Sequence, residues 1–279
     1  MEWLQDALAS AAYVGVAAAI FVIAKLVNDW TTPYRIDHEL MEKDNPALGV
    51  SILGYLLGVG LVLGGVLMGP SRGLGQDLID IAMYGLLGVV LLNLSRVLND
   101  RLILGRFSNV KEIIEDRNVG TGAVQAGSYI ASGLVVAGAV SGQGGGVVTA
   151  LAFFGLGQAC LVIFGLLYER LVPYDLHKEI EADNVAAGVA FGGALLALGI
   201  ILAKAAGGNF FSWGENLTRF GFTVLVGLIL LPLGRFFLEW VLFRSSNLAK
   251  EIAEDRNINA GFIELAVLSS FSIIVVISI

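Results

Sequence analysis

The chain has 279 residues, of which 56% are hydrophobic and only 15% charged, and its mean hydropathy is +0.79. These values lie outside the range of a soluble globular domain and indicate a membrane protein. The formal net charge of -7 argues against nucleic acid as a partner. A single cysteine, Cys160, excludes a disulfide framework within the chain.

Eight apolar runs follow one another along the chain. They cover residues 8–28, 46–68, 78–98, 119–141, 147–168, 185–206, 220–242 and 258–278. Each is about long enough to cross a hydrocarbon core of roughly 30 Å as a helix. The sequence therefore predicts an all-α, polytopic membrane protein whose eight transmembrane helices form four tandem hairpins of the same orientation.

The charges flanking these runs predict the topology. Glu2 and Asp6 precede the first run without any basic residue, the reverse of a signal-peptide n-region, so we expect this end to be retained and to face outward. Fourteen of the seventeen basic residues fall on the connector side: Lys25, Arg35, Lys43, Arg96, Arg101, Arg106, Lys111, Arg117, Arg170, Lys178, Arg235, Arg244, Lys250 and Arg256. The positive-inside rule then places the four connectors in the cytoplasm and both termini in the periplasm.

A connector motif occurs four times. Each copy has a cationic or imidazole residue seven places before an asparagine, a glutamate three places before it and a glycine four places after it. The copies are His38, Glu42, Asn45, Gly49; Lys111, Glu115, Asn118, Gly122; His177, Glu181, Asn184, Gly188; and Lys250, Glu254, Asn257, Gly261. The first two positions, four apart, predict an ion pair on a short helix. The asparagine is expected to cap the next helix, and Pro46 suits its first position.

The repeat has two levels. Asn45 to Asn184 and Asn118 to Asn257 are both 139 residues, which indicates a duplicated two-hairpin unit. We expect a first half of residues 1–140, with hairpins 1–70 and 76–141, and a second half of residues 141–279, with hairpins 147–207 and 218–279. Because every hairpin has the same orientation, the pseudo-symmetry axis runs along the membrane normal, which is compatible with a ring around a central path.

The connectors Lys111 to Asn118 and Lys250 to Asn257 share the pattern Lys-Glu-Ile-x-Glu-Asp-Arg-Asn. With its paired hairpins, the chain resembles the YjfL-like family of bacterial inner-membrane proteins, which carries a domain of unknown function in tandem copies. The resemblance covers nearly the whole chain and is weakest in the first connector, at residues 43–46. It implies a bacterial inner-membrane location and a repeated hairpin fold, but it implies no reaction.

Charged residues enter the predicted third and seventh helices. Only fifteen uncharged residues precede Arg96 and Arg235, so these charges reach the cytoplasmic part of the hydrocarbon region. The candidate polar interior comprises Arg96, Asp100, Gln125, Arg235, Glu239 and Glu264. Arg235 and Glu264 lie at similar depth in one hairpin and are predicted to form a buried pair, with Gln125 opposite Arg96 in the other half. Snorkelling and local ion pairing are the structural alternative.

An acid also ends the first helix of every hairpin: Asp29, Asp100, Glu169 and Glu239. Together with the connector carboxylates, these would focus a negative potential if the repeats closed into a ring. A solvated charged face is the alternative. For His38 and His177, ion pairing with Glu42 and Glu181 is favoured over metal binding or pH sensing, so neither a metal nor a cofactor is expected.

Two functions are consistent with these patterns. The first is a cation or polyamine channel or transporter with an acidic cytoplasmic vestibule, for which Glu264 should be accessible to water. The alternative is a membrane scaffold or stress-response partner that docks a cytoplasmic protein, for which Glu264 should be dry and Ile113, Ile114, Ile180 and Ile252 should be exposed as anchors. Enzyme motifs are absent from the sequence. The expected partners are the lipid bilayer, a cation or polyamine, a cytoplasmic protein and a second copy of the chain.

Overall fold

The computed structural model describes residues 2–242 and 246–279, and in these residues it contains twelve helices. Eight are long: α1 (Glu2–Thr31), α3 (Pro46–Leu67), α4 (Leu74–Leu102), α6 (Val119–Val140), α7 (Val147–Leu171), α9 (Val185–Ala206), α10 (Trp213–Leu242) and α12 (Ile258–Ser278). Each is apolar and long enough to cross a membrane, as the sequence predicted. Helices α1, α4 and α10 extend beyond their apolar runs at both ends or at the outer end.

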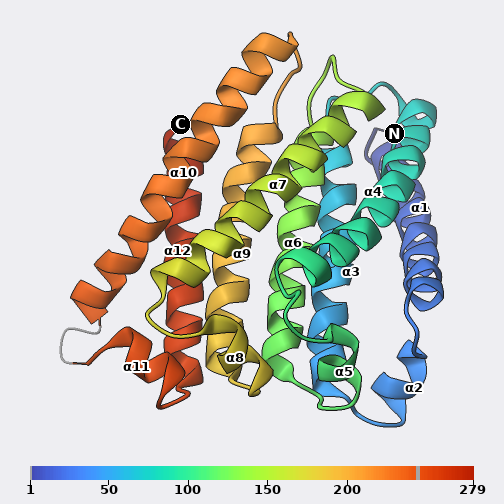
Figure 1. Ribbon diagram of the computed structural model, residues 1–279. Coiled ribbons are helices and arrows are strands. Elements are labelled where there is room, and N and C mark those ends of the chain that lie inside the picture. The colour runs from blue at the N-terminus through green and yellow to red at the C-terminus, as the bar shows by residue number, and fades with distance from the viewer. Residues whose placement is uncertain (1, 243–245) are drawn as a thin grey trace.

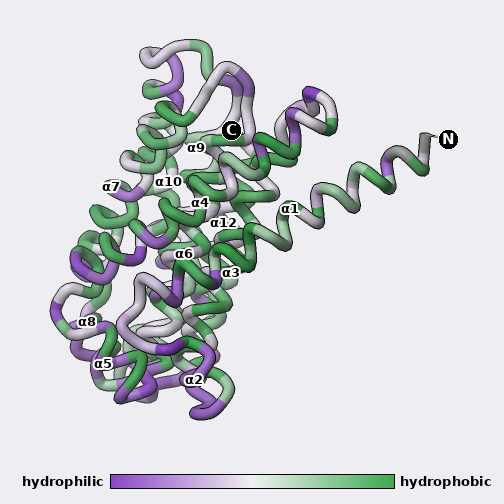
Figure 2. The backbone as a smooth tube through the Cα atoms, turned by 90° about the vertical axis from the view of Figure 1, so that its right-hand side faces the viewer, coloured by the Kyte–Doolittle hydropathy of each residue, from purple (hydrophilic) through white to green (hydrophobic). Residues whose placement is uncertain are grey.

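Four short helices join the two long helices of each hairpin. They are α2 (Ile36–Met41), α5 (Asn109–Ile114), α8 (Leu176–Glu181) and α11 (Leu248–Ala253). All four lie at the same end of the molecule, opposite the two termini (Figure 1), and hydrophilic residues gather at that end (Figure 2). The hairpins therefore share one orientation, as the motif predicted. Arg244, counted among the connector-side cations, lies outside the described residues.

The long helices form two layers. The return helices α3, α6, α9 and α12 stand side by side in one row, in that order. Helix α4 packs over α3 and α6, α7 over α6 and α9, and α10 over α9 and α12. Helix α1 packs mainly on α4 and more lightly on α3.

Glycine brings the return helices into backbone contact. A Cβ atom at Gly127 of α6 would lie 2.1 Å from the carbonyl oxygen of Gly192 in α9, and one at Gly188 would lie 2.3 Å from that of Gly120. The same occurs between α3 and α6, where a Cβ at Gly65 would lie 2.5 Å from the Cα of Ala137. Helices in lipid associate through such close packing, because burial of apolar surface from water contributes little there.

The expected ring is not formed within the described residues of one chain. Helices α3 and α12 occupy the two ends of the row and do not pack against each other. The row stays open because the inner return helices α6 and α9 use two opposite faces for their neighbours, which extends the array in a line. The condition for a central path and a vestibule enclosed by the four connectors is therefore not met within the described residues of a single chain.

The repeated asparagines begin the return helices, as predicted. The side-chain oxygens of Asn45, Asn118, Asn184 and Asn257 accept hydrogen bonds from backbone amides in the first turn that follows each of them. Pro46 is the first residue of α3, where its missing N–H costs nothing. The residue before each asparagine adopts a positive φ of 48° to 55°, namely Asp44, Arg117, Asp183 and Arg256. These left-handed residues turn the chain sharply from connector to return helix.

Candidate functional site

The predicted pair in the second half is present and includes a third residue. Arg235 of α10 donates to Oε1 of Glu264 in α12, and the two side chains are nearly or fully buried. The hydroxyl of Tyr168 in α7 donates to the same oxygen at 2.8 Å and accepts from Arg235 at 3.0 Å. The guanidinium also lies 5.4 Å from the centre of the Tyr168 ring, within cation–π range. Three spanning helices thus meet at one charged group.

One polar atom of this cluster has no partner among the described residues. Oε2 of Glu264 is buried and makes no hydrogen bond. Unsatisfied buried polar atoms are rare in native structures, and each calls for an explanation such as a functional role. Glu264 itself has no exposed surface, so the water-accessible carboxylate expected of a transporter is absent in this conformation.

A cavity of about 170 Å³ lies beside the cluster. Arg235 and Glu239, one turn apart on α10, both line it, together with Pro173 and Asn247. Pro232 also lines it and lies inside α10, where proline removes one backbone hydrogen bond and loosens the helix. Arg235 therefore lies between the buried Glu264 and a cavity that contains a second carboxylate.

The matching site in the first half is built differently. Gln125 of α6 donates to Asp100 at 3.1 Å and accepts from the hydroxyl of Ser51 in α3 at 2.7 Å. Arg96 donates to the carbonyl oxygen of Thr31 in α1 at 2.8 Å, and its buried Nε has no partner. Gln125 and Arg96 line the same small pocket, as their expected opposite positions suggest, but the amide of Gln125 bonds to Asp100, one turn further along α4. The two polar clusters belong to separate hairpins and do not line one shared path.

The connectors hold successive repeats together, a role that the motif did not predict. The side-chain amide of Asn45 donates to the carbonyl of Ile113 in the next connector, at 2.8 Å. Asn118 donates likewise to Ile180, and Asn184 to Ile252. Each asparagine therefore both caps its own helix and ties its repeat to the following one.

A second glutamate of each connector completes this arrangement. Glu112, Glu179 and Glu251 accept hydrogen bonds from the side chains of the asparagines that follow them, at 2.8 to 3.0 Å. Glu39 is the buried equivalent in the first connector. The motif singled out the glutamates three places before asparagine, whereas these lie five or six places before it. A glutamate occurs there in all four copies, and this was the available signal.

The structure alters part of the predicted connector pairing. His38 and Glu42 form the expected pair at 3.0 Å. Lys111 pairs with Asp116 at 2.9 Å instead of with Glu115, and Lys250 forms no ion pair among the described residues.

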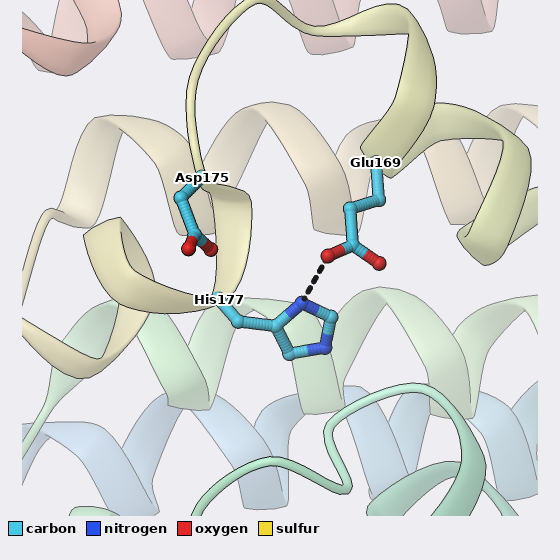
Figure 3. Close-up of side chains that lie close together, drawn as sticks. All are labelled: Glu169, Asp175 and His177. Carbon is cyan, nitrogen blue, oxygen red and sulfur yellow. Dashed lines mark hydrogen bonds and ion pairs between the residues drawn. The ribbon is translucent and has the colours of Figure 1, made fainter.

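His177 does not pair with Glu181, and that prediction was wrong. Figure 3 shows its Nδ1 facing Glu169, 3.2 Å away, with Asp175 nearby. Its Nε2 lies 2.7 Å from the carbonyl oxygen of Ile103. Glu169, Asp175 and His177 together have metal-ligand geometry, but the guanidinium of Arg106 already contacts Glu169 at 2.6 Å and Asp175 at 3.6 Å. In the first hairpin Lys25 likewise contacts two carboxylates, Asp29 and Asp37, so we interpret the cluster as an ion-pair network at the end of α7.

A cavity of about 400 Å³ lies at the opposite end of the molecule and was not predicted. Tyr13, Asp77 and Asp80 line it, as does the glycine-rich segment 142–146. Tyr13 donates to Asp77 at 2.9 Å, and Arg72 pairs with Asp80. The glycine run, expected as a plain external turn, forms part of the wall and is bonded to the loop before α10 through Gln143.

The pKa values of two connector glutamates in equivalent positions, Glu39 and Glu112, are shifted in opposite directions. Burial raises the pKa of Glu112 above its ordinary value. Burial acts in the same direction on Glu39, but hydrogen bonds from Lys43 and Asn45 outweigh it and lower the pKa of Glu39. The difference arises because the first connector supplies a lysine that contacts Glu39 at 2.7 Å.

The fold and these contacts define a class: a multi-pass helical membrane protein made of two tandem copies of a two-hairpin unit. The family described as Domain of Unknown Function (DUF350) matches residues 2–140 and again residues 144–279. The chain belongs to this family, and the two matched segments correspond to the two predicted halves.

Relatives give the same picture. The chain is 27% identical over 238 residues to a "UPF0719 transmembrane protein" of Aquifex aeolicus, a match that covers 82% of this chain and 84% of the relative. It is 35% identical over 68 residues to the "UPF0719 inner membrane protein YjfL" of Escherichia coli K12, covering 23% of this chain and 52% of that protein. No solved structure matches the chain significantly. The protein is thus a multi-pass inner-membrane protein of this family, as the connector motif indicated.

Proposed function

We propose that the protein is a cation transporter in which Glu264 is the binding carboxylate, with small inorganic cations and polyamines as the substrate classes. The observation that carries this proposal is the buried cluster of Arg235, Glu264 and Tyr168 in the membrane region, with one carboxylate oxygen unpartnered. Ionisable groups at membrane depth are expensive and are found mostly on ion or substrate pathways.

Arg235 supplies the mechanism. In the described conformation it neutralises Glu264, so no cation can bind there. If Arg235 turned toward Glu239, which lines the same cavity one turn away, Glu264 would be left with a free negative charge for a cation from that cavity. Exchange between two carboxylates costs less than exposing an unpaired guanidinium, because Arg235 keeps a partner in both states. Alternation of this kind needs no open pore, which agrees with the open row of helices.

We also propose that the connectors face the cytoplasm and both termini the periplasm. The bias of basic residues toward the connector end supports this orientation. The cavity beside Arg235 is lined by Asn247, from the segment before α11, and therefore opens near the connector end. No reaction is part of the proposal, because the sequence contains no nucleotide, metalloprotease or nucleophile motif.

The scaffold interpretation predicted a dry Glu264, which is found, but its second expectation has less support. It required apolar anchors exposed on the connectors, whereas Ile113, Ile180 and Ile252 are buried between repeats and Ile114 is half-buried. Their carbonyl groups receive the asparagine side chains, so these residues hold the repeats together instead of facing a partner.

Flux measurements test the transport proposal. The purified protein in proteoliposomes should move at least one cation from a panel of alkali ions, protons and polyamines, and Glu264→Gln should abolish that flux while the protein still folds. Glu215→Gln, an exposed glutamate at the outer end of α10, is the matched control and should transport normally. The paired replacement Arg235→Met with Glu264→Met removes both charges together and should leave thermal stability close to that of the parent, again without flux. Normal flux in both Glu264 variants would refute the proposal.

A further inference from the structure

We propose that the open α3 edge of one chain binds the open α12 edge of a second copy, head to tail, through the same surface that joins successive repeats within the chain. This inference concerns assembly and does not depend on the transport proposal. It rests on how the three internal junctions are built and on what remains unpaired at the two ends of the row.

Each internal junction uses the same two contacts. The asparagine of one repeat donates to a connector carbonyl of the next, as in Asn184 to Ile252. The motif glycine of the later repeat lies against a backbone carbonyl of the earlier return helix. A Cβ at Gly122 would lie 2.4 Å from the oxygen of Ala47, and one at Gly261 would lie 2.6 Å from that of Ala186.

The exposed edge of α3 carries the groups that the later repeat contributes to such a junction, the motif glycine and the connector carbonyl, but no earlier repeat packs against them in the part of the chain that the structure describes. Gly49 is the remaining motif glycine, the one in the first connector motif. A Cβ there would meet only one side-chain atom of Leu40, at 4.0 Å. A Cβ at Gly64, which corresponds to Ala203 in the second half, would meet nothing within 4 Å. Leu40 lies where Ile113 and Ile252 lie in their connectors, and among the described residues its carbonyl receives no asparagine side chain. The α3 edge therefore has the junction groups in place, and no return helix of the described residues packs on them.

Helix α1 also lacks the neighbour that its equivalent has. Helix α7 packs in the groove between α6 and α9, and 44% of its most apolar window is buried. The corresponding groove for α1 would lie between α3 and a preceding return helix. None of the described helices lies on the far side of that groove, and only 11% of the α1 window is buried. Figure 2 shows α1 extending away from the rest of the molecule.

The α12 edge has the earlier half of the junction. The side-chain amide of Asn257 donates to Glu251 in its own connector but has no following connector to bind. Helix α12 corresponds to α6 at an offset of 139 residues. Among the α6 residues that contact α9 are Gly120, Gly127, Ala131 and Gly138, and their equivalents in α12 are Asn259, Ala266, Ser270 and Ile277. The larger Asn259 and Ile277 would then face the vacant Gly49 and Gly64 of the partner, so that side chains fill the space that glycine leaves.

The family match adds an independent argument. One family unit ends near residue 140 and the next begins at residue 144, so the contact between α6 and α9 joins two copies of the same unit. The surface that α12 presents therefore descends from one that already binds an α3-type edge. Contacts of this kind are heterologous, and they generate rings where the rotation between copies closes.

Cysteine cross-linking in membranes tests the proposal. In a Cys160→Ala background, Gly49→Cys is placed in one tagged chain and Asn259→Cys in a second, differently tagged chain. These positions correspond to Gly188 and Gly120, where a Cβ on the first would lie 2.4 Å from the Cα of the second. That is closer than disulfide geometry, so the two chains must lie slightly further apart than α6 and α9, as the larger Asn259 already requires, and this brings the two cysteines into disulfide range. Oxidation should give a covalent dimer containing both tags when the chains are co-expressed. One chain that carries both cysteines should give a ladder of higher species, because α3 and α12 lie at opposite ends of its row.

The controls separate this contact from others. Gly49→Cys paired with Trp240→Cys, a highly exposed position on α10, should give no cross-link. Cross-linking of Gly49→Cys chains with themselves would show a two-fold contact and overturn the proposal, as would equal cross-linking through Trp240. Maleimide labelling verifies that each cysteine is present and reactive. Reactive thiols that fail to form the mixed dimer would also overturn it.

Discussion

The hydroxyl of Tyr168 donates to Glu264, 96 residues later in the chain, and thereby links the first helix of the third hairpin to the return helix of the fourth. The same hydroxyl accepts from Arg235, so one oxygen atom joins both members of the buried ion pair. In the first half the corresponding position holds Asn28, which is buried but makes no such contact. The cluster is therefore specific to the second half.

Removing this hydroxyl should destabilise the protein. In Tyr168→Phe, Glu264 loses a donor in a buried site and cannot replace it with water, so the free energy of unfolding should fall by about 1 to 3 kcal/mol. Thermal unfolding in detergent, compared with the parent, measures the change. Tyr84→Phe is the matched control, because no hydrogen bond of Tyr84 is found among the described residues, and its midpoint should stay within a degree or two of the parent's. Equal loss in both variants would show that the hydroxyl contributes nothing specific.

The close approach of α6 and α9 should not tolerate a single added methyl group. In Gly127→Ala the new Cβ would lie 2.1 Å from the carbonyl oxygen of Gly192, so the two helices must separate and lose contacts along their length. We expect a loss of at least about 2 kcal/mol. Gly155→Ala in α7, where a Cβ meets nothing within 4 Å, should be neutral or slightly stabilising. Similar unfolding midpoints for the two variants would contradict the contact.

The sequence contained the helices, the shared orientation of the hairpins and the duplication, because these follow from local patterns: apolar length, the repeated connector motif and its spacing. The pair Arg235 and Glu264 was also predictable, since helix rise places both at one depth. What could not be predicted was which faces meet. Two-fold repetition of hairpins suits a ring and a row equally well, and only the glycine contacts on opposite faces of α6 and α9 decide for the row. Tyr168 was missed because it reaches the pair from another hairpin.

Glu39 and Glu112 should respond to pH in opposite directions. The pKa of Glu112 is raised, so its contribution to stability is fully present below the ordinary glutamate value of 4.5 and is lost as the pH rises through the folded value. The pKa of Glu39 is lowered, so its contribution is present above 4.5 and is lost as the pH falls. At neutral pH, Glu39→Gln should therefore lower the unfolding midpoint, whereas Glu112→Gln should leave it equal or raise it.

Unfolding midpoints of both variants across the acidic range measure this difference. Relative to the parent, the deficit of Glu39→Gln should shrink on acidification, because the parent then loses its own ion pair with Lys43. Any advantage of Glu112→Gln should also shrink, because the parent carboxylate becomes protonated. Parallel pH profiles for the two variants would show that the lysine contact does not distinguish the connectors.

Gln125→Glu should fail to convert the first half into a copy of the second. The change places a glutamate at position 125, as at position 264 in the second half. The amide nitrogen of Gln125 donates to Asp100 at 3.1 Å, whereas an ionised glutamate has no proton to donate. Two carboxylates at that separation in a buried site repel each other, and Arg96 is already bonded to Thr31. We expect a loss of about 2 to 5 kcal/mol, the range for an uncompensated buried charge.

Adding Asp100→Asn should rescue most of that loss, because asparagine can donate to the new carboxylate and removes the repulsion. The equivalent of Asp100 in the second half, Glu239, lines the cavity beside Arg235 and makes no hydrogen bond to Glu264, which is why a carboxylate is tolerated there. Thermal unfolding of the single and double variants gives the coupling energy between the two positions. A single variant as stable as the parent, or a double variant no better than the single, would show that Asp100 does not determine the residue at position 125.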